Sequence, residues 1–284
     1  MTRRWALAAV AALMLGGCGA TSSPNQPSAP GASPSTGSLV VRNGVTEQPV
    51  TAQVSPQSPR VGDRVTVNAA GYLTREQVLE TGDVFLWPGD PAYVHEVAYW
   101  EFNDSSFRTL RWTAGFTVTV DDSLAGDAAI MAKAREVAAE AARNIGFPVT
   151  VGAGGAVTIG VDPALGDMDA VAQASVDSRG SVINGARIVF IRRDEIAGGA
   201  GATYTNTFLH EMGHVIGLGH SPDITEVMTP AEGPGTFAQV YQPKEASCLH
   251  MIYAHRRAGN FYPDRDPAFT ASAASSPRHT VIID

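Results

Sequence analysis

The feature of the sequence that most constrains the fold is a histidine cluster, because residues 210–220 read HEMGHVIGLGH. Residues four positions apart lie on one face of an α-helix, so His210 and His214 can direct their imidazoles at one point. Gly217 can adopt the left-handed conformation that ends a helix and turns the chain. We therefore predict a helix followed by a glycine turn, which brings His220 back beside the first two histidines.

The residue types in this cluster predict a catalytic zinc site. Three neutral imidazoles leave one tetrahedral position of the metal open for water, whereas structural zinc sites fill all four positions. Zinc lowers the pKa of bound water from about 15.7 to about 7. Glu211 adjoins the first ligand, so its carboxylate can accept a proton from that water and pass it to a leaving amine. The expected reaction is hydrolysis of a peptide bond in a protein or peptide substrate.

Two simpler interpretations of the cluster stand beside this one. A bare His-Glu-x-x-His also arises by chance on helices with surface histidines, although Gly217 and His220 at fixed spacing make a chance match far rarer. A purely structural zinc would leave Glu211 without a role. Both interpretations are weaker than a catalytic site.

The stretch from His210 to Ser221, with VMTP at 227–230, resembles the metzincin metallopeptidases. It is most similar to the matrixins, in which a serine follows the third histidine. The resemblance implies an α+β domain with a twisted mixed sheet, an active-site helix and a C-terminal helix. It also implies that Met228 lies beneath the zinc ligands as an apolar floor, with Gly217 and Ser221 as further support. The alternatives are ordinary core for Met228 and a loop hydroxyl for Ser221.

The resemblance covers about residues 109–262 and is specific only within 205–231. It implies that an extended substrate pairs through backbone hydrogen bonds with an edge strand at about Val171–Val176. The wall of the family's specificity pocket, Pro-x-Tyr, is replaced here by Pro230-Ala231-Glu232, so no substrate preference is predicted.

The chain departs from the matrixins at the positions of further metal sites. Animal matrixins hold a second, structural zinc on upstream histidines, and no histidine lies between His95 and His210. Gln173 and Arg187 stand where two of those ligands are expected, so we predict one zinc ion. The acidic pair at 194–195 falls near a calcium position of the family. A solvated pair is the favoured interpretation, which leaves calcium an unsupported alternative.

The N-terminus is typical of an export signal. Arg3 and Arg4 precede an apolar run at 5–15 that is too short to span a membrane. The sequence Leu-Gly-Gly-Cys that ends at Cys18 resembles the bacterial lipobox, in which the cysteine is lipidated. An ordinary signal peptide cut near Ala20 is the alternative. We expect an exported protein outside the cytoplasm, anchored by lipid to a bacterial membrane.

Composition divides the rest of the chain. A signal peptide (1–17) is followed by a disordered tether of small and polar residues (18–38) and a β-rich segment (39–108), then by the α+β catalytic domain (109–262) and a polar tail (263–284). Apolar periodicity predicts helices at 124–145, 205–216 and 243–257 and strands at 116–121, 149–151, 157–161, 171–176 and 187–191.

The remaining histidines and cysteines are assigned to packing. His250, His255 and His279 lack metal partners at suitable spacing, and His95 lies in a β-like run, so all four are predicted to be surface or packing residues. Cys248 is expected to be a small buried hydrophobe on the last helix. With Cys18 in the leader, residues 39–108 cannot inhibit the site through a cysteine.

The net charge and the aromatic residues limit the classes of partner that we expect. The formal net charge of −8 argues against nucleic acid, which needs a basic surface. The tryptophans Trp87, Trp100 and Trp112 are expected to anchor the core or an interface. We expect a monomer that acts on proteins or peptides. The alternative is a surface-anchored binding lipoprotein. In that case residues 39–108 bind the partner, and the protease domain is incidental or narrowly specific.

Overall fold

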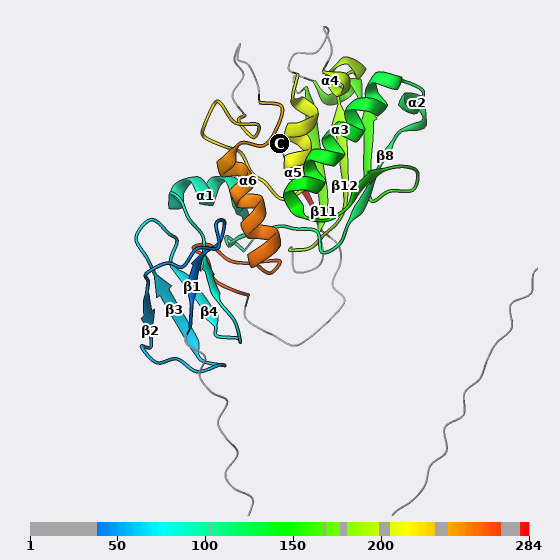
Figure 1. Cartoon of the computed structure of the whole chain (residues 1–284). Helices are drawn as coiled ribbons and strands as arrows, with labels where there is room; N and C mark the ends of the chain where they lie inside the picture. The colour runs from blue at the N-terminus through cyan, green and yellow to red at the C-terminus, as the bar shows by residue number, and fades with distance from the viewer. Residues whose placement is uncertain are drawn as a thin grey trace, which may run out of the picture. The chain divides into compact units, whose positions relative to one another are not determined.

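The chain folds into a mixed α+β structure with a six-stranded mixed sheet and several helices (Figure 1). The computed structural model describes residues 39–102, 104–166, 169–176, 181–198, 205–230, 238–267 and 279–283. The α+β class expected from the sequence is therefore confirmed. The predicted signal peptide, tether and lipidation site at Cys18 lie outside the described residues.

The six-stranded sheet is built mainly from residues 116–190. Its strands are β8 (Phe116–Val120), β9 (Val149–Val151), β10 (Val157–Val161), β11 (Ala170–Val176), β12 (Ile183–Phe190) and β13 (His279–Ile283). The order is β13-β11-β12-β10-β8-β9. Strands β8, β9, β10 and β12 run parallel, whereas β11 is antiparallel to both β12 and β13. The strands predicted in this region are confirmed.

The strand expected at the sheet edge, Val171–Val176, is not at the edge of the described sheet. It belongs to β11, and β13 pairs with it from Ala172↔Ile283 to Val176↔His279. An edge strand exposes unpaired N–H and C=O groups that another strand can bind. The C-terminal strand reads HTVII, whose β-branched residues favour that role. The segment predicted to be a polar tail, 263–284, therefore contributes a strand to the main sheet.

Helices α3 (Ala128–Ile145) and α5 (Thr207–Val215) lie side by side on one face of this sheet (Figure 1). The Asp127 side chain caps α3 by accepting hydrogen bonds from two backbone N–H groups, and Gly146 ends it at φ 73°. Helix α3 buries seven residues, and the four at 130–138 are alanine, isoleucine or valine. These apolar side chains allow the helix to pack closely on the sheet. Short helices α2 (Asp122–Ala125), η1 (Pro163–Leu165) and α4 (Arg193–Ala197) complete this region.

The N-terminal segment is mostly β, as predicted, but it also contains a helix. The strands are β1 (Val41–Asn43), β2 (Gln53–Ser55), β3 (Arg64–Asn68), β4 (Arg75–Val78), β5 (Val84–Leu86), β6 (Trp100–Glu101) and β7 (Phe107–Arg108). The run around His95, expected to be β-like, forms helix α1 (Pro91–Ala98). Asp90 caps this helix, and Val94, Val97 and Ala98 are buried at helical spacing.

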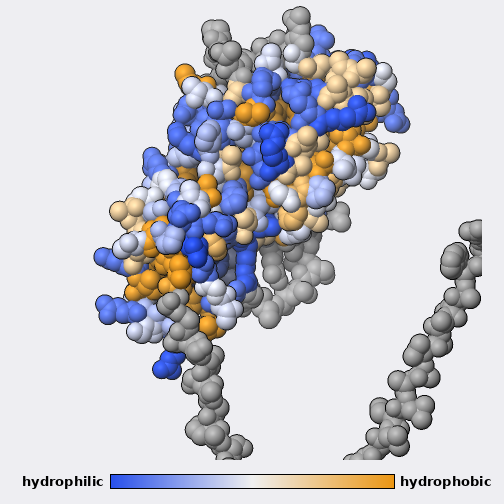
Figure 2. Space-filling view, viewed as in Figure 1, coloured by the Kyte–Doolittle hydropathy of each residue, from blue (hydrophilic) through white to orange (hydrophobic). Residues whose placement is uncertain are grey.

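Part of this N-terminal segment, including Trp87 and helix α1, packs into the main core with the large sheet. The buried residues of its strands form a smaller core of their own: Val41, Val65, Val67, Leu79, Val84 and Leu86. Trp87 and Trp112 are buried, and half-buried Trp100 packs against the same core, so the expected role of the tryptophans is confirmed. The described residues from 39 onward belong to one compact unit. Figure 2 shows apolar side chains at the surface over the N-terminal strands, where Val61 and Val78 are 61% and 43% exposed.

A buried ion-pair cluster links the N-terminal segment to residues beyond 255. Asp264 accepts hydrogen bonds from Arg75 of β4 at 2.9 Å and from Arg256 at 2.7 and 2.8 Å. The Asp264 side chain is fully buried, although it lies in the segment predicted to be a polar tail. The carboxylate belongs in the core because it neutralises two guanidinium groups there.

The last helix begins with Pro243 in its first turn, as predicted. It comprises α6 (Pro243–His250), followed by the π-helical turn η2 (Met251–His255). Cys248 is 1% exposed, which confirms its expected place in the core. Among the helices of the described segments, none combines the length and the apolar character needed to cross a membrane.

Candidate metal centre

The C-terminal end of α5, which carries His210 and His214, is held by three aromatic side chains. Carbonyls at a helix end lack partners within the helix. Here Trp112 Nε1 donates to the carbonyl of Val215 (2.8 Å), Tyr253 Oη to that of Ile216 (2.9 Å), and Trp100 Nε1 to that of Gly217 (3.0 Å). The N-terminal segment, the main sheet region and the last helix therefore all fix the end of α5.

The turn after α5 has the predicted glycine geometry. Gly217 has a φ of 101°, and a Cβ at this position would lie 2.3 Å from the carbonyl oxygen of Leu110. Only glycine fits both restraints. Two residues later, Gly219 N–H donates to the carbonyl of Val97 at 2.8 Å. Helix α1 thus positions the segment that leads to His220.

The three histidines converge as the spacing predicts. The Nε2 atoms of His210 and His214 lie 3.1 Å apart. One ligand atom from each of these rings and from His220 lies within 4.8 Å of the others, so the group can hold a metal ion. Ring-centroid distances of 4.8, 5.4 and 4.9 Å place the three imidazoles around one point.

Backbone carbonyls select the tautomer of two of these rings. The Nδ1 atom of His210 lies 2.8 Å from the carbonyl oxygen of Val227, and Nδ1 of His214 lies 2.8 Å from that of Leu218. A carbonyl only accepts, so Nδ1 must donate and the lone pair of the neutral ring is at Nε2. Metal-binding histidines are commonly oriented by this type of hydrogen bond.

Burial keeps the same two rings neutral. Burial, together with the neighbouring histidines, lowers the pKa of His210 to about 4 and holds the pKa of His214 well below its usual value. A neutral imidazole is the form that binds a metal ion. The two rings are therefore ready to act as ligands at neutral pH.

Met228 and Ser221 shape the loop beneath α5. Met228 is fully buried, and a Cβ on Gly213 would lie 2.2 Å from its sulfur, so the thioether lies against the helix between the two histidine turns. Ser221 N–H donates to the carbonyl of Met228 at 2.7 Å, and its hydroxyl donates to Glu226 at 2.5 Å. The positions fit the support roles expected for both residues. Glu211 lies on the same helix and is 6% exposed.

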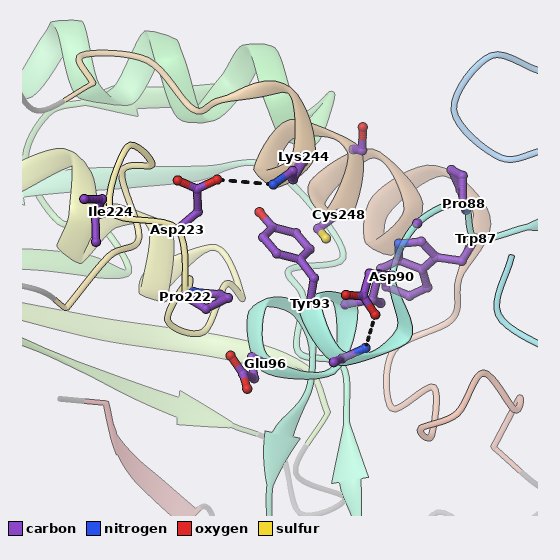
Figure 3. Close-up of a pocket in the computed structure, with 14 residues that line it drawn as sticks. Trp87, Pro88, Asp90, Tyr93, Glu96, Pro222, Asp223, Ile224, Lys244 and Cys248 are labelled. Atoms are coloured by element: carbon purple, nitrogen blue, oxygen red, sulfur yellow. Dashed lines mark hydrogen bonds and ion pairs between the residues drawn. The ribbon is translucent and has the colours of Figure 1, made fainter. Parts of the chain in front are cut away.

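A cavity of about 820 Å³ adjoins the segment after His220. It is lined by α1, residues 222–224 and α6, and Figure 3 shows Tyr93 between them. The Tyr93 hydroxyl donates to the same Glu226 oxygen that Ser221 binds, and Lys244 pairs with Asp223 at 3.2 Å. Sequence reasoning missed these residues, because their contacts join distant parts of the chain and follow no motif.

The other expected metal positions have different outcomes. Gln173 and Arg187 face each other across β11 and β12. The interpretation of residues 194–195 as a solvated pair is wrong for Glu195, which is buried and pairs with Arg192. Calcium gains no support from this pair. The altered pocket wall extends to Ala231 and Glu232, which lie outside the described residues.

A second group of potential ligands was not expected. His250 and His255 come together with Glu47, and one ligand atom of each lies within 4.8 Å of the others. His255 stacks on Phe85, as its predicted packing role requires, and the structure also brings both histidines beside a carboxylate that their sequence spacing does not reveal.

No model of a known protein family matches the chain, and no curated protein is significantly similar to it.

Proposed function

We propose that the chain is a zinc-dependent endopeptidase of the metzincin type, most similar to the matrixins. The observation that carries the proposal is the convergence of three imidazoles on one point, two of them buried, neutral and oriented through Nδ1. Zinc favours nitrogen ligands in tetrahedral geometry, and three protein ligands leave the fourth position for catalysis. Glu211 on the same helix supplies the acid–base group.

The chemistry divides between the metal and the chain. Zinc, when bound, supplies an acidified water and polarises the peptide carbonyl. The Glu211 carboxylate accepts one proton and delivers it to the nitrogen of the leaving amine. His210 and His214 keep their protons at Nδ1 throughout, because Val227 and Leu218 hold them there. Trp100 packs edge-on against His214, with ring centroids 5.7 Å apart, and shields that side from solvent.

The arrangement of elements supports a metzincin-like fold. The resemblance implies a twisted mixed sheet, two helices, a methionine turn and then a third helix. The chain has a mixed sheet with α3 and α5, buried Met228 after the third histidine, and α6 after that. Among the sheet strands β8 to β12, β11 alone runs antiparallel to its neighbour. This strand contacts α5.

The substrate class follows from the edge of the sheet. An extended peptide can add to an exposed edge through backbone hydrogen bonds. The chain's own β13 occupies such a position on β11, in antiparallel register over five residue pairs. The β11 edge is thus able to pair with an extended segment, which supports protein or peptide substrates. The proposal also includes that the protein is an exported monomer that is anchored by lipid at Cys18 to a bacterial membrane and acts on proteins or peptides.

One observation favours the rival binding function. Apolar side chains, including Val61 and Val78, are exposed over the N-terminal strands (Figure 2). Against the rival, the same segment helps to build the metal centre, since Trp100 holds the end of α5 and Val97 holds Gly219.

Chelation tests the proposal directly. The chain from residue 39 should cleave a mixed peptide library, lose that activity when zinc is removed, and regain it when zinc returns. His214→Ala should not be rescued by zinc, whereas Arg135→Ala, at an exposed position of α3, should behave as wild type. Cleavage that persists without metal, or in His214→Ala, would contradict the proposal.

A further inference from the structure

The second ligand group joins the first loop of the folded region to the end of the last helix. Glu47 lies in the turn after β1, His250 ends α6, and His255 ends η2. The rings of the two histidines are 5.2 Å apart and nearly perpendicular, at 72°. One ligand atom from each of the three residues lies within 4.8 Å of the other two.

The π-helical turn explains why these histidines meet. Residues five apart on an α-helix point about 140° away from each other, since each residue turns the helix by about 100°. A π-helix forms hydrogen bonds from residue i to i+5, which brings residues five apart onto one face. His250 directly precedes the π turn at 251–255 and His255 ends it, so their spacing suits this geometry and no α-helical pattern.

One ring nitrogen of each histidine is available to bind a cation. The Nε2 atoms of both histidines are buried and have no hydrogen-bond partner in the described structure. The His255 ring hydrogen-bonds to the backbone of Gly44, and Nδ1 must make this bond because Nε2 has none. The two orphan Nε2 atoms are costly unless something binds them.

The surroundings hold the group in place. His255 stacks on Phe85 of β5, with ring centroids 3.9 Å apart and planes 17° apart. Gly44 lies so close to the helix that a Cβ there would be 2.1 Å from the sulfur of Met251. Glu47 is exposed, and Arg42 donates a hydrogen bond to its backbone carbonyl at 2.9 Å. An exposed carboxylate therefore lies beside the two imidazoles, one of which is held in place by stacking.

We propose that Glu47, His250 and His255 form a second metal site, which takes a divalent transition metal and fits zinc best. Two imidazole nitrogens and one carboxylate oxygen are ordinary zinc ligands, and water completes the tetrahedron. The ion clamps the loop after β1 onto the last helix. This site replaces the single-zinc prediction, and it does not rest on the peptidase proposal.

Zinc content per chain tests the site. The chain from residue 39 should bind two zinc ions, His214→Ala should bind one, and His214→Ala with His255→Phe should bind none. Phenylalanine preserves the stacking on Phe85, so the fold is expected to persist. In the His214→Ala background, added zinc should raise Tm, and His255→Phe should abolish that shift.

A surface variant separates ligand loss from misfolding. In the same His214→Ala background, Glu47→Gln should weaken zinc binding at least 10-fold, while Glu80→Gln, another exposed carboxylate, should leave affinity unchanged. Zinc retained at one per chain in the double histidine variant would overturn the site, as would a folded His214→Ala chain without zinc. Equal affinities for Glu47→Gln and Glu80→Gln would refute the carboxylate ligand. Loss of peptide cleavage with this zinc retained would refute only the peptidase proposal.

Discussion

Asp264→Asn removes the negative charge that neutralises two buried arginines. The Asp264 side chain is fully buried, and those of Arg75 and Arg256 are 4% and 1% exposed. The carboxylate accepts three hydrogen bonds of 2.7 to 2.9 Å from the two guanidinium groups. Asparagine keeps the size of the side chain but leaves both positive charges without this partner.

The magnitude follows from the burial of the cluster. Removing one partner of a buried ion pair costs about 3–5 kcal/mol, because the remaining charge stays buried and uncompensated. Arg75 keeps a second partner, Asp266, at 2.6 Å, so the lower end of this range applies. A loss of about 3 kcal/mol lowers Tm by roughly 6–12 °C for a domain of about 150–250 residues.

Thermal unfolding followed by circular dichroism measures this effect. The matched control is Glu80→Gln, which breaks the ion pair with Arg257 on the surface, where the side chains are 61% and 44% exposed. Exposed pairs contribute about 0–1 kcal/mol, so the control should shift Tm by only a few degrees. The reasoning is refuted if Asp264→Asn shifts Tm no more than the control. A separate early transition of the N-terminal segment would refute its integration into one unit.

Three further perturbations test other parts of the structure. Gly213→Ala places a Cβ 2.2 Å from the sulfur of Met228, so it should lower both Tm and zinc affinity, whereas Gly126→Ala, with open space around it, should change neither. Removal of residues 268–284 takes β13 from the β11 edge, so KM for peptides should fall with kcat unchanged; an unchanged KM would mean that peptides do not use this edge. Burial raises the pKa of Glu245 to about 7, above its unfolded value, so its contribution to stability is complete below about pH 4.5 and is lost as the pH rises to about 7. Urea titrations across this range should show that decline in wild type but not in Glu245→Gln, and parallel curves would contradict it.

The features predicted from the sequence are those that depend on nearby residues. The spacing of His210, His214 and Gly217 predicts a helix and a turn, because each step involves residues at most a few positions apart. The strands at 149–151 and 157–161 follow from short apolar runs between turns, and the structure has the same bounds. Cys248 was assigned to the core from its helical neighbours alone.

The features missed depend on contacts between distant segments or on unusual local geometry. Asp264 is an ordinary polar residue until Arg75, 189 positions away, is brought beside it. Strand β13 is a short segment whose partner, β11, lies about a hundred residues earlier and is revealed only by the fold. His250 and His255 have no α-helical relation, and the π turn that joins them is not encoded by periodicity. The Asp90 cap and the packing of Val94 decide that α1 is helical.

The most direct test of the central proposal is peptide cleavage by Glu211→Gln, with zinc content measured on the same preparation. General acid–base groups contribute about 100- to 10,000-fold to rate. The proposal predicts that Glu211→Gln keeps the zinc content of wild type and loses cleavage by a factor in this range. Wild-type cleavage by this variant, with its zinc in place, would contradict the assignment of Glu211 and with it the proposed mechanism.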